Sequence, residues 1–417
     1  MQHLWKVLLI AFLLRVVFAF IVWHPDLNNH VDWGIRFWQY GPEKFYSQNV
    51  WSFSWPNQPP GTIIIFALVR KLFELIFNFF WWVNVNLPVF PSAIMLFFEE
   101  RLYQALLKLP AILADLGMAY LIFKFLKGKL GLWGASLFLF NPVTWYNSAI
   151  WGQTDATVNF FSLLSIMLLL ERKLKWSMIA IFTSLFIKVS LVIMVPILAM
   201  VAIKQKYQIK DWLKSILLAA LIVGGLTLPF SKGEPFSWLV NLYQTKVFEW
   251  QLHIITANAF NLWATLAGIH ERPDTLFLGP LTYHNWGLIL FGLAAVPLLY
   301  KVYKNHDSKN IFWVATLIAF AAFTFLTGMH ERYLYPLFPL FTILVAWNRK
   351  LLPLLVGISI IHLLNLYNFW WYPRVEWLVN LMSAGDRLLP RILGLITTAI
   401  FLWLYWYFFK TSKTVKK

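Results

Sequence analysis

Four side chains that could take part in proton transfer lie close together between residues 26 and 43, in a polar stretch, 24–61, whose flanking segments are strongly apolar. They are Asp26, His30, Asp32 and Glu43. Carboxylates and imidazoles accept protons from reacting hydroxyl groups. Ionisable groups beside a membrane span are costly unless they serve a purpose, so such a cluster indicates chemistry. We therefore expect a functional site in this stretch.

Cations and aromatic rings later in the chain complete the groups that one reaction class needs. In sugar transfer from a lipid phosphate, the acceptor hydroxyl loses a proton to a base, and the departing phosphate needs positive charge and hydrogen-bond donors. Lys188, Arg332 and His330 could supply the latter, and tryptophans such as Trp33 and Trp151 could stack on a sugar. No separate soluble domain of the kind used by nucleotide-sugar enzymes is evident. The residue types therefore favour a lipid-phosphate donor.

The composition places these groups in a membrane protein. Of 417 residues, 60% are hydrophobic and only 13% are charged, whereas soluble proteins contain about 25% charged residues. The net charge of +17 does not predict binding to nucleic acid, because the basic residues form short clusters between apolar runs. That distribution is typical of cytoplasmic loops. The absence of cysteine excludes disulfides and thiolate metal sites.

The basic clusters also predict the topology. If all of them are cytoplasmic, the spans between them come in pairs, each with an outer turn. The expected helical pairs are 131–171, 176–203, 310–347 and 351–409. The expected single spans are 4–23, about 105–127, one that ends near Phe230 and one that starts near Trp286. We therefore predict one all-α, polytopic domain over residues 1–417, with about twelve spans of about 17 to 22 residues and both termini cytoplasmic. The expected location is the plasma or inner membrane.

Two long outer segments follow from this topology. The first covers residues 24–104, and its apolar part from Thr62 to Phe98 is interrupted by charges and prolines. Its apolar runs could form two further spans, but we favour helices in the outer interface, with Trp81 and Trp82 at headgroup level. The second large outer segment covers residues 230–285.

The unusual polar residues fall on one side of this predicted topology. Each lies at an outer turn or at the outer end of a helix, and a cavity open to the outer leaflet explains them together. They are Asp26, Asp32, Asp115, Asn147, Gln153, Asp155, Lys188, Asn258, Asn261, His330, Glu331 and Arg332. Ordinary loop polarity explains any one of them equally well, but not the whole set. We expect the active site at the outer face.

Three blocks of residues carry a resemblance to a known family. The first is Asp26 with Trp33 seven residues later, followed by NQPPG at 57–61; the second is NPVTWYNSAIWGQTDA from Asn141; the third is HERYLYP from His330. In this order they resemble the GT-C superfamily of integral-membrane glycosyltransferases, which use polyprenyl- or dolichyl-phosphate sugars. Within it, the chain resembles bacterial proteins related to the second GPI mannosyltransferase, and more distantly the asparagine-linked-glycan glucosyltransferases. Gln58 departs from the pattern, because a tyrosine often precedes the proline pair in that family.

The resemblance implies an inverting transfer of a hexose, with mannose as a candidate, from a polyprenyl-phosphate donor to a lipid-linked or glycan acceptor. The family's base is an aspartate just after the first helix, so Asp26 is the preferred catalytic base and a helix cap is its alternative role. Asp32 is the rival base, and it could instead orient the acceptor or the loop. A single base that acts in a direct displacement implies inversion at the anomeric carbon.

The other candidate residues divide into donor-binding and pocket groups. His330, Glu331 and Arg332 are assigned to the donor phosphate or sugar, although an Arg–Glu pair could simply hold the turn. Lys188 could bind the phosphate or extend harmlessly to the outer headgroups, and the second interpretation is slightly preferred. Candidates for the acceptor or the pocket are His30, Trp33, Gln58, Gln153, Asp155 and Asp115. Asp115 could also be a buried partner of Arg101 or Lys108.

No cofactor is expected, and no metal, because the sequence contains no paired spacing such as HxxxH. The expected partners are the sugar donor, the acceptor and membrane lipids. A transporter or flippase of lipid-linked sugars is the alternative class, but no inverted repeat is visible and the polar residues are not at the midplane. A glycan polymerase or ligase would act at the same face on a diphosphate-linked oligosaccharide.

Overall fold

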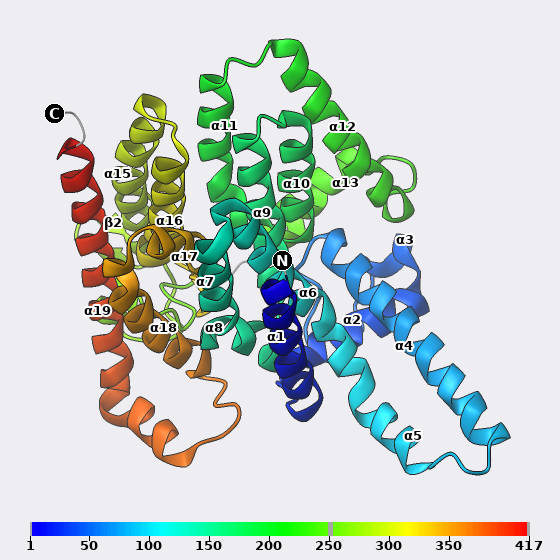
Figure 1. Ribbon diagram of the computed structural model, residues 1–417. Coiled ribbons are helices and arrows are strands. Elements are labelled where there is room, and N and C mark those ends of the chain that lie inside the picture. Colours follow the sequence, from blue (N-terminus) through cyan, green and yellow to red (C-terminus); the bar gives the residue numbers. More distant parts are fainter. Residues whose placement is uncertain (1, 249–252, 415–417) are drawn as a thin grey trace.

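The computed structural model describes residues 2–248 and 253–414, and these are almost entirely helical (Figure 1). The helices of the first half are α1 (Gln2–Ile21), α2 (Leu27–Tyr40), α3 (Pro42–Phe45), α4 (Pro60–Asn86), α5 (Ala93–Phe97), η1 (Phe98–Leu102), α6 (Tyr103–Leu126), α7 (Gly128–Leu139), α8 (Pro142–Trp145), η2 (Tyr146–Trp151), α9 (Asp155–Leu170), α10 (Leu174–Ile187), η3 (Val189–Met194) and α11 (Val195–Lys204). The second half contains α12 (Ile209–Thr227), η4 (Leu228–Phe230), α13 (Pro235–Leu242), η5 (Tyr243–Phe248), α14 (Leu262–Ala267), β1 (Phe277–Leu278), β2 (Leu281–Thr282), α15 (Tyr283–Lys304), α16 (Ser308–Phe325), α17 (Leu337–Trp347), η6 (Arg349–Leu351), α18 (Leu352–Tyr367) and α19 (Glu376–Thr414).

Seven helical segments in the described part of the chain are long and apolar enough to cross a membrane. They are His3–Ile21, Ala93–Leu126, Ile209–Phe230, Tyr283–Lys304, Ser308–Phe325, Arg349–Tyr367 and Glu376–Thr411. Four shorter apolar helical segments of 10–17 residues are Asp155–Leu170, Leu174–Ile187, Val189–Lys204 and Leu337–Trp347. The protein is therefore all-α with the helices of a membrane protein, whereas the expected number of about twelve spans stays a prediction.

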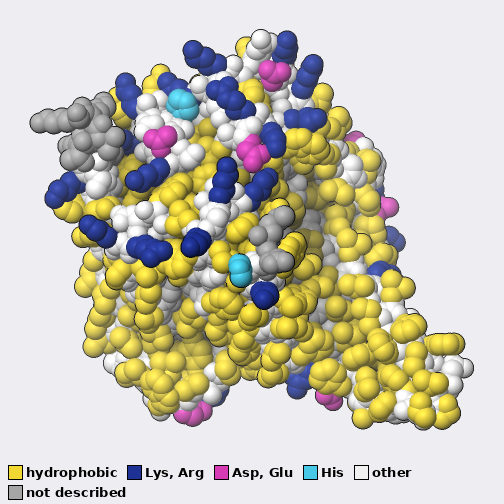
Figure 2. Space-filling model, viewed as in Figure 1, with side chains coloured by type: hydrophobic (Ala, Val, Ile, Leu, Met, Phe, Trp, Pro, Cys, Tyr) yellow, Lys and Arg dark blue, Asp and Glu magenta, His cyan; other side chains and the backbone are white. Residues whose placement is uncertain are grey.

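Basic side chains gather toward one end of the molecule. On the face shown in Figure 2, lysines and arginines crowd the upper part, around the α11–α12 and α15–α16 turns, and a broad apolar surface lies below them. Those turns carry Lys204, Lys206, Lys210 and Lys304. This separation of charge is the one that a protein in a bilayer needs.

The segment from Thr62 to Phe98 is helical, as we expected. α4 is continuous for 27 residues. Within it, Arg70 and Lys71 both pair with Glu74 one turn later, at 2.9 and 2.7 Å. After a turn at 87–92, the chain enters the helical run Ala93–Leu126. This hairpin projects at the lower right of Figure 1, with a largely apolar surface in Figure 2. Its place in the outer interface stays a prediction.

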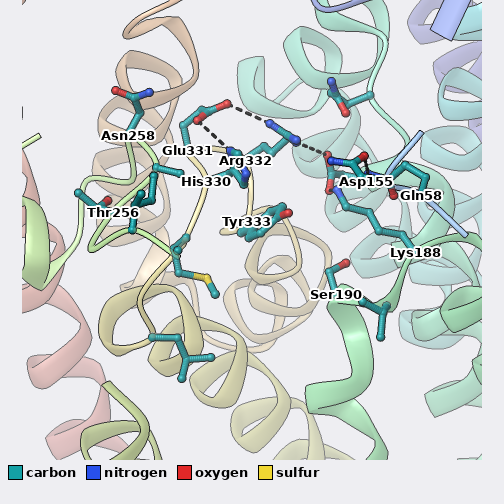
Figure 3. Close-up of a pocket in the computed structure, with 18 of the residues that line it drawn as sticks. Gln58, Asp155, Lys188, Ser190, Thr256, Asn258, His330, Glu331, Arg332 and Tyr333 are labelled. Carbon is teal, nitrogen blue, oxygen red and sulfur yellow. Dashed lines mark hydrogen bonds and ion pairs between the residues drawn. The ribbon is translucent and has the colours of Figure 1, made fainter. Parts of the chain in front are cut away.

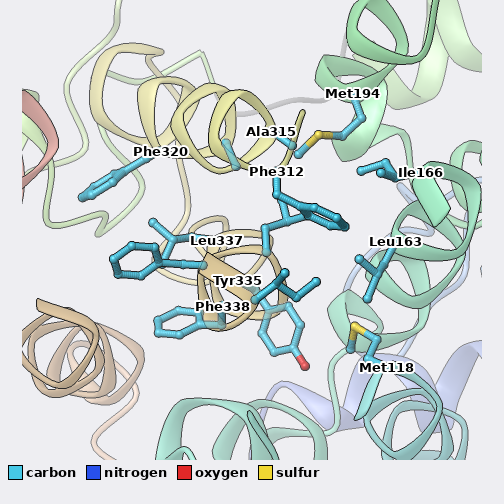
Figure 4. Packing of buried hydrophobic residues seen from close by; sticks show 14 of the residues in the cluster. Met118, Leu163, Ile166, Met194, Phe312, Ala315, Phe320, Tyr335, Leu337 and Phe338 are labelled. Carbon is cyan, nitrogen blue, oxygen red and sulfur yellow. The ribbon is translucent and has the colours of Figure 1, made fainter. Parts of the chain in front are cut away.

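The apolar core forms around α16 and α17 (Figure 4). Phe312 and Phe320 of α16 and Phe338 of α17 are buried, and they pack in one cluster with Met118 of α6 and Leu163 of α9. Within the apolar window of α16, 83% of the residues are buried, compared with 28% for α15. α16 is therefore a central helix, and the turn that follows it is held firmly at both ends.

A buried ion pair ties α1 to α6. Arg15 Nε lies 3.0 Å from the Asp115 carboxylate, and neither side chain is exposed. Arg15 also donates to the Leu139 carbonyl oxygen and to Thr144 Oγ1, at 3.0 and 3.1 Å. Asp115 therefore pairs with Arg15 rather than with Arg101 or Lys108, the two partners suggested by the sequence.

Candidate functional site

A cavity of about 870 Å³ opens among the segments that carry the predicted polar residues. Its wall comes from the start of α2, the starts of α4 and α9, the α10–η3 turn, residues 253–274, the α16–α17 turn and a bend inside α19. Each of these segments precedes, follows or interrupts a helix. Their side chains therefore reach one space although they are far apart in the sequence.

Asp26 stands at the N-terminal end of α2 and lines this cavity. Its side chain makes no capping bond to the helix. Instead, the carboxylate accepts hydrogen bonds from Trp151 Nε1 at 3.0 Å, Gln153 Nε2 at 2.5 Å and Asn29 Nδ2 at 3.0 Å. Three neutral donors orient the group without neutralising its charge. The helix-cap role considered from the sequence is not observed.

The surroundings keep Asp26 ionised. Burial alone would raise its pKa, but the charge of Arg332, the nearby His30 and the Trp151 hydrogen bond together hold the pKa below the ordinary value of 3.8. A carboxylate favoured in its charged form accepts a proton only when a reaction supplies one.

Four charged side chains of alternating sign form a continuous row along the cavity (Figure 3). Glu331 Oε1 lies 3.1 Å from Arg332 Nη1, and Arg332 Nε lies 3.8 Å from Asp155 Oδ2. Asp155 Oδ1 in turn lies 2.8 Å from Lys188 Nζ. The row alternates in sign, so its charges balance. The two cations also lie against the Tyr333 ring, with Lys188 Nζ 4.9 Å and Arg332 Cζ 5.6 Å from its centroid.

Local structure explains how the row is held. Asp155 occupies the first turn of α9, where the helix dipole favours a carboxylate. Lys188 directly follows α10 in an extended conformation. Just before α9, Gly152 has a φ of +84°, and a Cβ there would lie 2.9 Å from side-chain atoms of Leu27 and Lys108. Glycine is therefore required at this turn, which presents Gln153 to Asp26.

The turn after α16 supplies His330 and Glu331. Burial, together with the charges of Arg332 and Lys188, lowers the pKa of His330 well below 6.5, so its imidazole is neutral at pH 7. Burial raises the pKa of Glu331, although the Arg332 guanidinium opposes this effect. His330 can thus serve as a neutral hydrogen-bond donor or acceptor rather than as a cation.

Most of the pocket residues predicted from the sequence line the cavity. These are His30, Trp33, Gln58, Gln153, Asp155, Lys188, His330, Glu331 and Arg332. Lys188 is nearly buried and ion-paired, so the slightly preferred interpretation, in which it extends to the headgroups, is not what the structure shows. Asp115 does not line the cavity, because the Arg15 pair, Ser148 and Tyr335 hold it in the core.

The rival aspartate, Asp32, also lies outside the cavity wall. Its carboxylate accepts from the backbone N–H and the hydroxyl of Ser52, both at 2.9 Å, and pairs with Arg36 at 3.3 Å. These contacts tie the 50–54 loop to α2. The next turn of that loop is anchored by Trp33 Nε1, which donates to the Ser54 carbonyl oxygen at 2.8 Å.

Other cavity residues were not predicted as site residues from the sequence. Asp274 is buried and accepts from Thr327 Oγ1 at 2.9 Å, and its carboxylate lies 3.1 Å from His284 Nδ1. Arg387 enters from within α19, and Trp370 donates to Glu331 at 3.4 Å. The sequence signal for Arg387 is the run from Gly385 to Arg391, where a glycine, a proline and three charged residues interrupt an apolar segment.

No group of three or more His, Asp or Glu side chains in residues 2–248 and 253–414 is arranged to hold a metal ion. The expectation of a metal-independent reaction stays a prediction. A scan against protein-family models finds no match to this chain. No curated protein matches it either. The membership of the GT-C superfamily is therefore a hypothesis whose support comes from the geometry of the site.

Proposed function

We propose that the protein is a GT-C-type glycosyltransferase that transfers a hexose, with mannose as the first candidate, from a polyprenyl-phosphate donor. The acceptor is a lipid-linked sugar or glycan at the outer face of the membrane. The observation that carries this proposal is the carboxylate of Asp26, which faces a large cavity, is held by three neutral donors and is not used to cap its helix.

In the proposed reaction, Asp26 accepts the proton of an acceptor hydroxyl as that oxygen bonds to the anomeric carbon. The bond from the anomeric carbon to the donor phosphate breaks, and the phosphate leaves with its electron pair. One base and one direct displacement invert the anomeric configuration. Ionised Asp26 suits this role because its lowered pKa keeps the carboxylate free of a proton before the reaction.

Arg332 and Lys188 are proposed to hold the departing phosphate. Both cations line the cavity and have planar or compact donor groups that suit phosphate oxygens. Their carboxylate partners Asp155 and Glu331 fix their positions before substrate arrives. Positioned charge of this kind stabilises a developing anion without reorganisation during the reaction.

The cavity has the volume of a ligand-binding pocket. Pockets for single small ligands range from about 300 to 1,000 Å³, and the volume here is about 870 Å³.

We further propose that the shorter apolar helices cross the membrane in pairs with the longer ones. This arrangement gives about twelve spans, with both termini cytoplasmic and the cavity on the outer side.

The decisive experiment uses purified full-length protein with synthetic polyprenyl-phosphate-mannose, -glucose and -galactose. We expect one donor to be consumed and Asp26→Asn to lower kcat by about 10²- to 10⁴-fold, the usual contribution of a general base. The melting temperature should remain close to that of the parent protein, because Asn retains an oxygen for the Trp151 and Gln153 donors.

Asp32→Asn is the matched control, since it makes the same substitution within α2, outside the cavity wall. Its transfer rate should stay within about tenfold of the parent protein. Undiminished transfer in Asp26→Asn, or an equal loss in both variants, would overturn the assignment of the base.

A further inference from the structure

Arg387 is a third cation of the cavity wall, and it is bound differently from the first two. Lys188 and Arg332 each pair with a carboxylate. Arg387 has one hydrogen bond among the described residues, from Nη1 to the amide oxygen of Asn258 at 3.3 Å. Its positive charge is therefore oriented but not neutralised by an ion pair.

The carboxylate next to Arg387 in the sequence, Asp386, pairs with other residues. Asp386 pairs with His270 at 3.0 Å and with Arg391 at 3.6 Å, and it does not pair with Arg387. Asp274, another carboxylate of the cavity wall, is occupied by Thr327 and His284. Glu271 also lines the cavity but is exposed, so water and salt screen its charge. The wall around Arg387 thus retains a cation for a ligand.

The backbone at this point is strained. Gly385, Asp386 and Arg387 have φ values of 55°, 55° and 56° inside α19, a left-handed conformation that is unfavourable for the two non-glycine residues. Strain of this kind persists where the surrounding structure imposes it, and it clusters at functional sites. Here it breaks the helix beside the cavity and brings Arg387 into its wall.

Arg387 lies at a different part of the cavity from Lys188. In Figure 3, its partner Asn258 is at one end of the labelled residues and Lys188 is near the other, with His330, Glu331 and Arg332 between them. Glu331 is already engaged by Arg332 and Trp370. One phosphate held by Lys188 and Arg332 therefore leaves Arg387 for a second anion.

We propose that Arg387 and Asn258 form a second anion subsite, which binds a phosphate group of the acceptor. The guanidinium binds the phosphate oxygens, and the Asn258 amide fixes the orientation of the guanidinium. The assignment of this phosphate to the acceptor rests on the proposed transfer reaction, whereas the anion subsite itself does not. The acceptor class is then a phosphate-bearing lipid or glycan rather than a neutral sugar.

The subsite is tested by calorimetric titration of the full-length protein in neutral detergent with hexyl phosphate, and with hexanol as the uncharged probe of equal length. We expect two hexyl phosphate sites and no comparable hexanol binding. Arg387→Gln should weaken one site by about 10- to 100-fold, the effect of a lost hydrogen bond to a charged group. Arg332→Gln should weaken the other site and leave the Arg387 site in place.

Arg391→Gln is the matched control, because Arg391 is on the same helix and pairs with Asp386 but does not line the cavity. It should retain both sites, and all variants should unfold close to the parent temperature. Two intact sites in Arg387→Gln, or an equal loss in Arg391→Gln, would overturn the subsite.

A kinetic comparison distinguishes the acceptor from the donor. With an acceptor that carries phosphate, Arg387→Gln should raise the acceptor KM by about tenfold or more, and with the dephosphorylated acceptor it should not. A rise in the donor KM instead would show that Arg387 binds the phosphate of the donor, and it would overturn the acceptor assignment. If the protein transfers no sugar at all, the proposed function fails while the hexyl phosphate result still decides the subsite.

Discussion

The molecule contains two buried networks of charged side chains, and they are built differently. In the core, Arg15 and Asp115 are enclosed by donors and acceptors on every side, including Thr144, Ser148 and Tyr335. Along the cavity, Arg332 Nε and Asp155 Oδ2 are 3.8 Å apart, beyond hydrogen-bonding distance. Neither of these two atoms has another hydrogen-bond partner in the described part of the chain.

The difference separates structural charge from charge that is available for chemistry. A closed network satisfies its own groups and joins helices that are distant in the sequence. An open network keeps hydrogen-bonding capacity toward a ligand, and it tolerates this capacity only because it borders a cavity. The same distinction separates Asp32, whose oxygens bind Ser52 and Arg36, from Asp26, which faces the cavity.

The largest expected effect on stability is the loss of the core carboxylate. Asp115→Ala leaves the Arg15 cation buried without its partner, which should lower the free energy of unfolding by about 3 to 5 kcal/mol. Tryptophan fluorescence during thermal unfolding in detergent would measure this change. Asp155→Ala, in the cavity network, should cost less stability, because water in the cavity can solvate Lys188.

Transfer should respond in the opposite order, with the greater loss of kcat in Asp155→Ala. An equal or greater loss of stability in Asp155→Ala would remove the distinction between the closed and the open network.

A smaller effect is expected from one hydroxyl of the core network. Tyr335 donates to Asp115, so Tyr335→Phe should lower the free energy of unfolding by about 1 to 2 kcal/mol. Tyr333→Phe is the comparison in the cavity, where the ring lies against Lys188 and Arg332. Because that ring is kept, the change should stay within about 0.5 kcal/mol. Denaturant titration of both variants would sharpen the contrast, and equal losses would contradict it.

The smallest expected effect is that of pH. Asp26 has a lowered pKa and therefore stays ionised as the pH falls through the ordinary range. His24 and His30, beside it, have pKa values lowered to about 3 and about 4, chiefly by burial, so both remain neutral. We expect kcat to change by less than about twofold between about pH 5 and about pH 8.

Initial rates at saturating donor would show whether kcat is flat over this range. An acid limb near the ordinary histidine pKa, absent in His330→Asn, would show that the charged form of His330 inhibits transfer and that the pKa of His330 is not lowered.

Part of this site could be predicted from the sequence. Asp26, Asp155, Lys188 and the His330 motif lie at polar interruptions of apolar runs, and the structure brings all of them to one cavity. The sequence shows the charges that interrupt the segment 62–98, but not that Arg70 and Lys71 both lie within one helical turn of Glu74 in a continuous α4. Such pairing depends on the conformation that the segment adopts, not on its composition.

The sequence by itself determined the class of fold and the chemical types at the site, because hydropathy and charge are properties of local segments. Only the tertiary structure decided which partner each charged side chain binds. Asp115 pairs with Arg15, 100 positions away. Asp32 accepts a hydrogen bond from Ser52 in the 50–54 loop. Arg387 donates to Asn258, 129 positions away. Helix packing decides which side chain lies beside a buried charge. Packing brings together residues that are far apart in the sequence, so their contact cannot be read from the sequence.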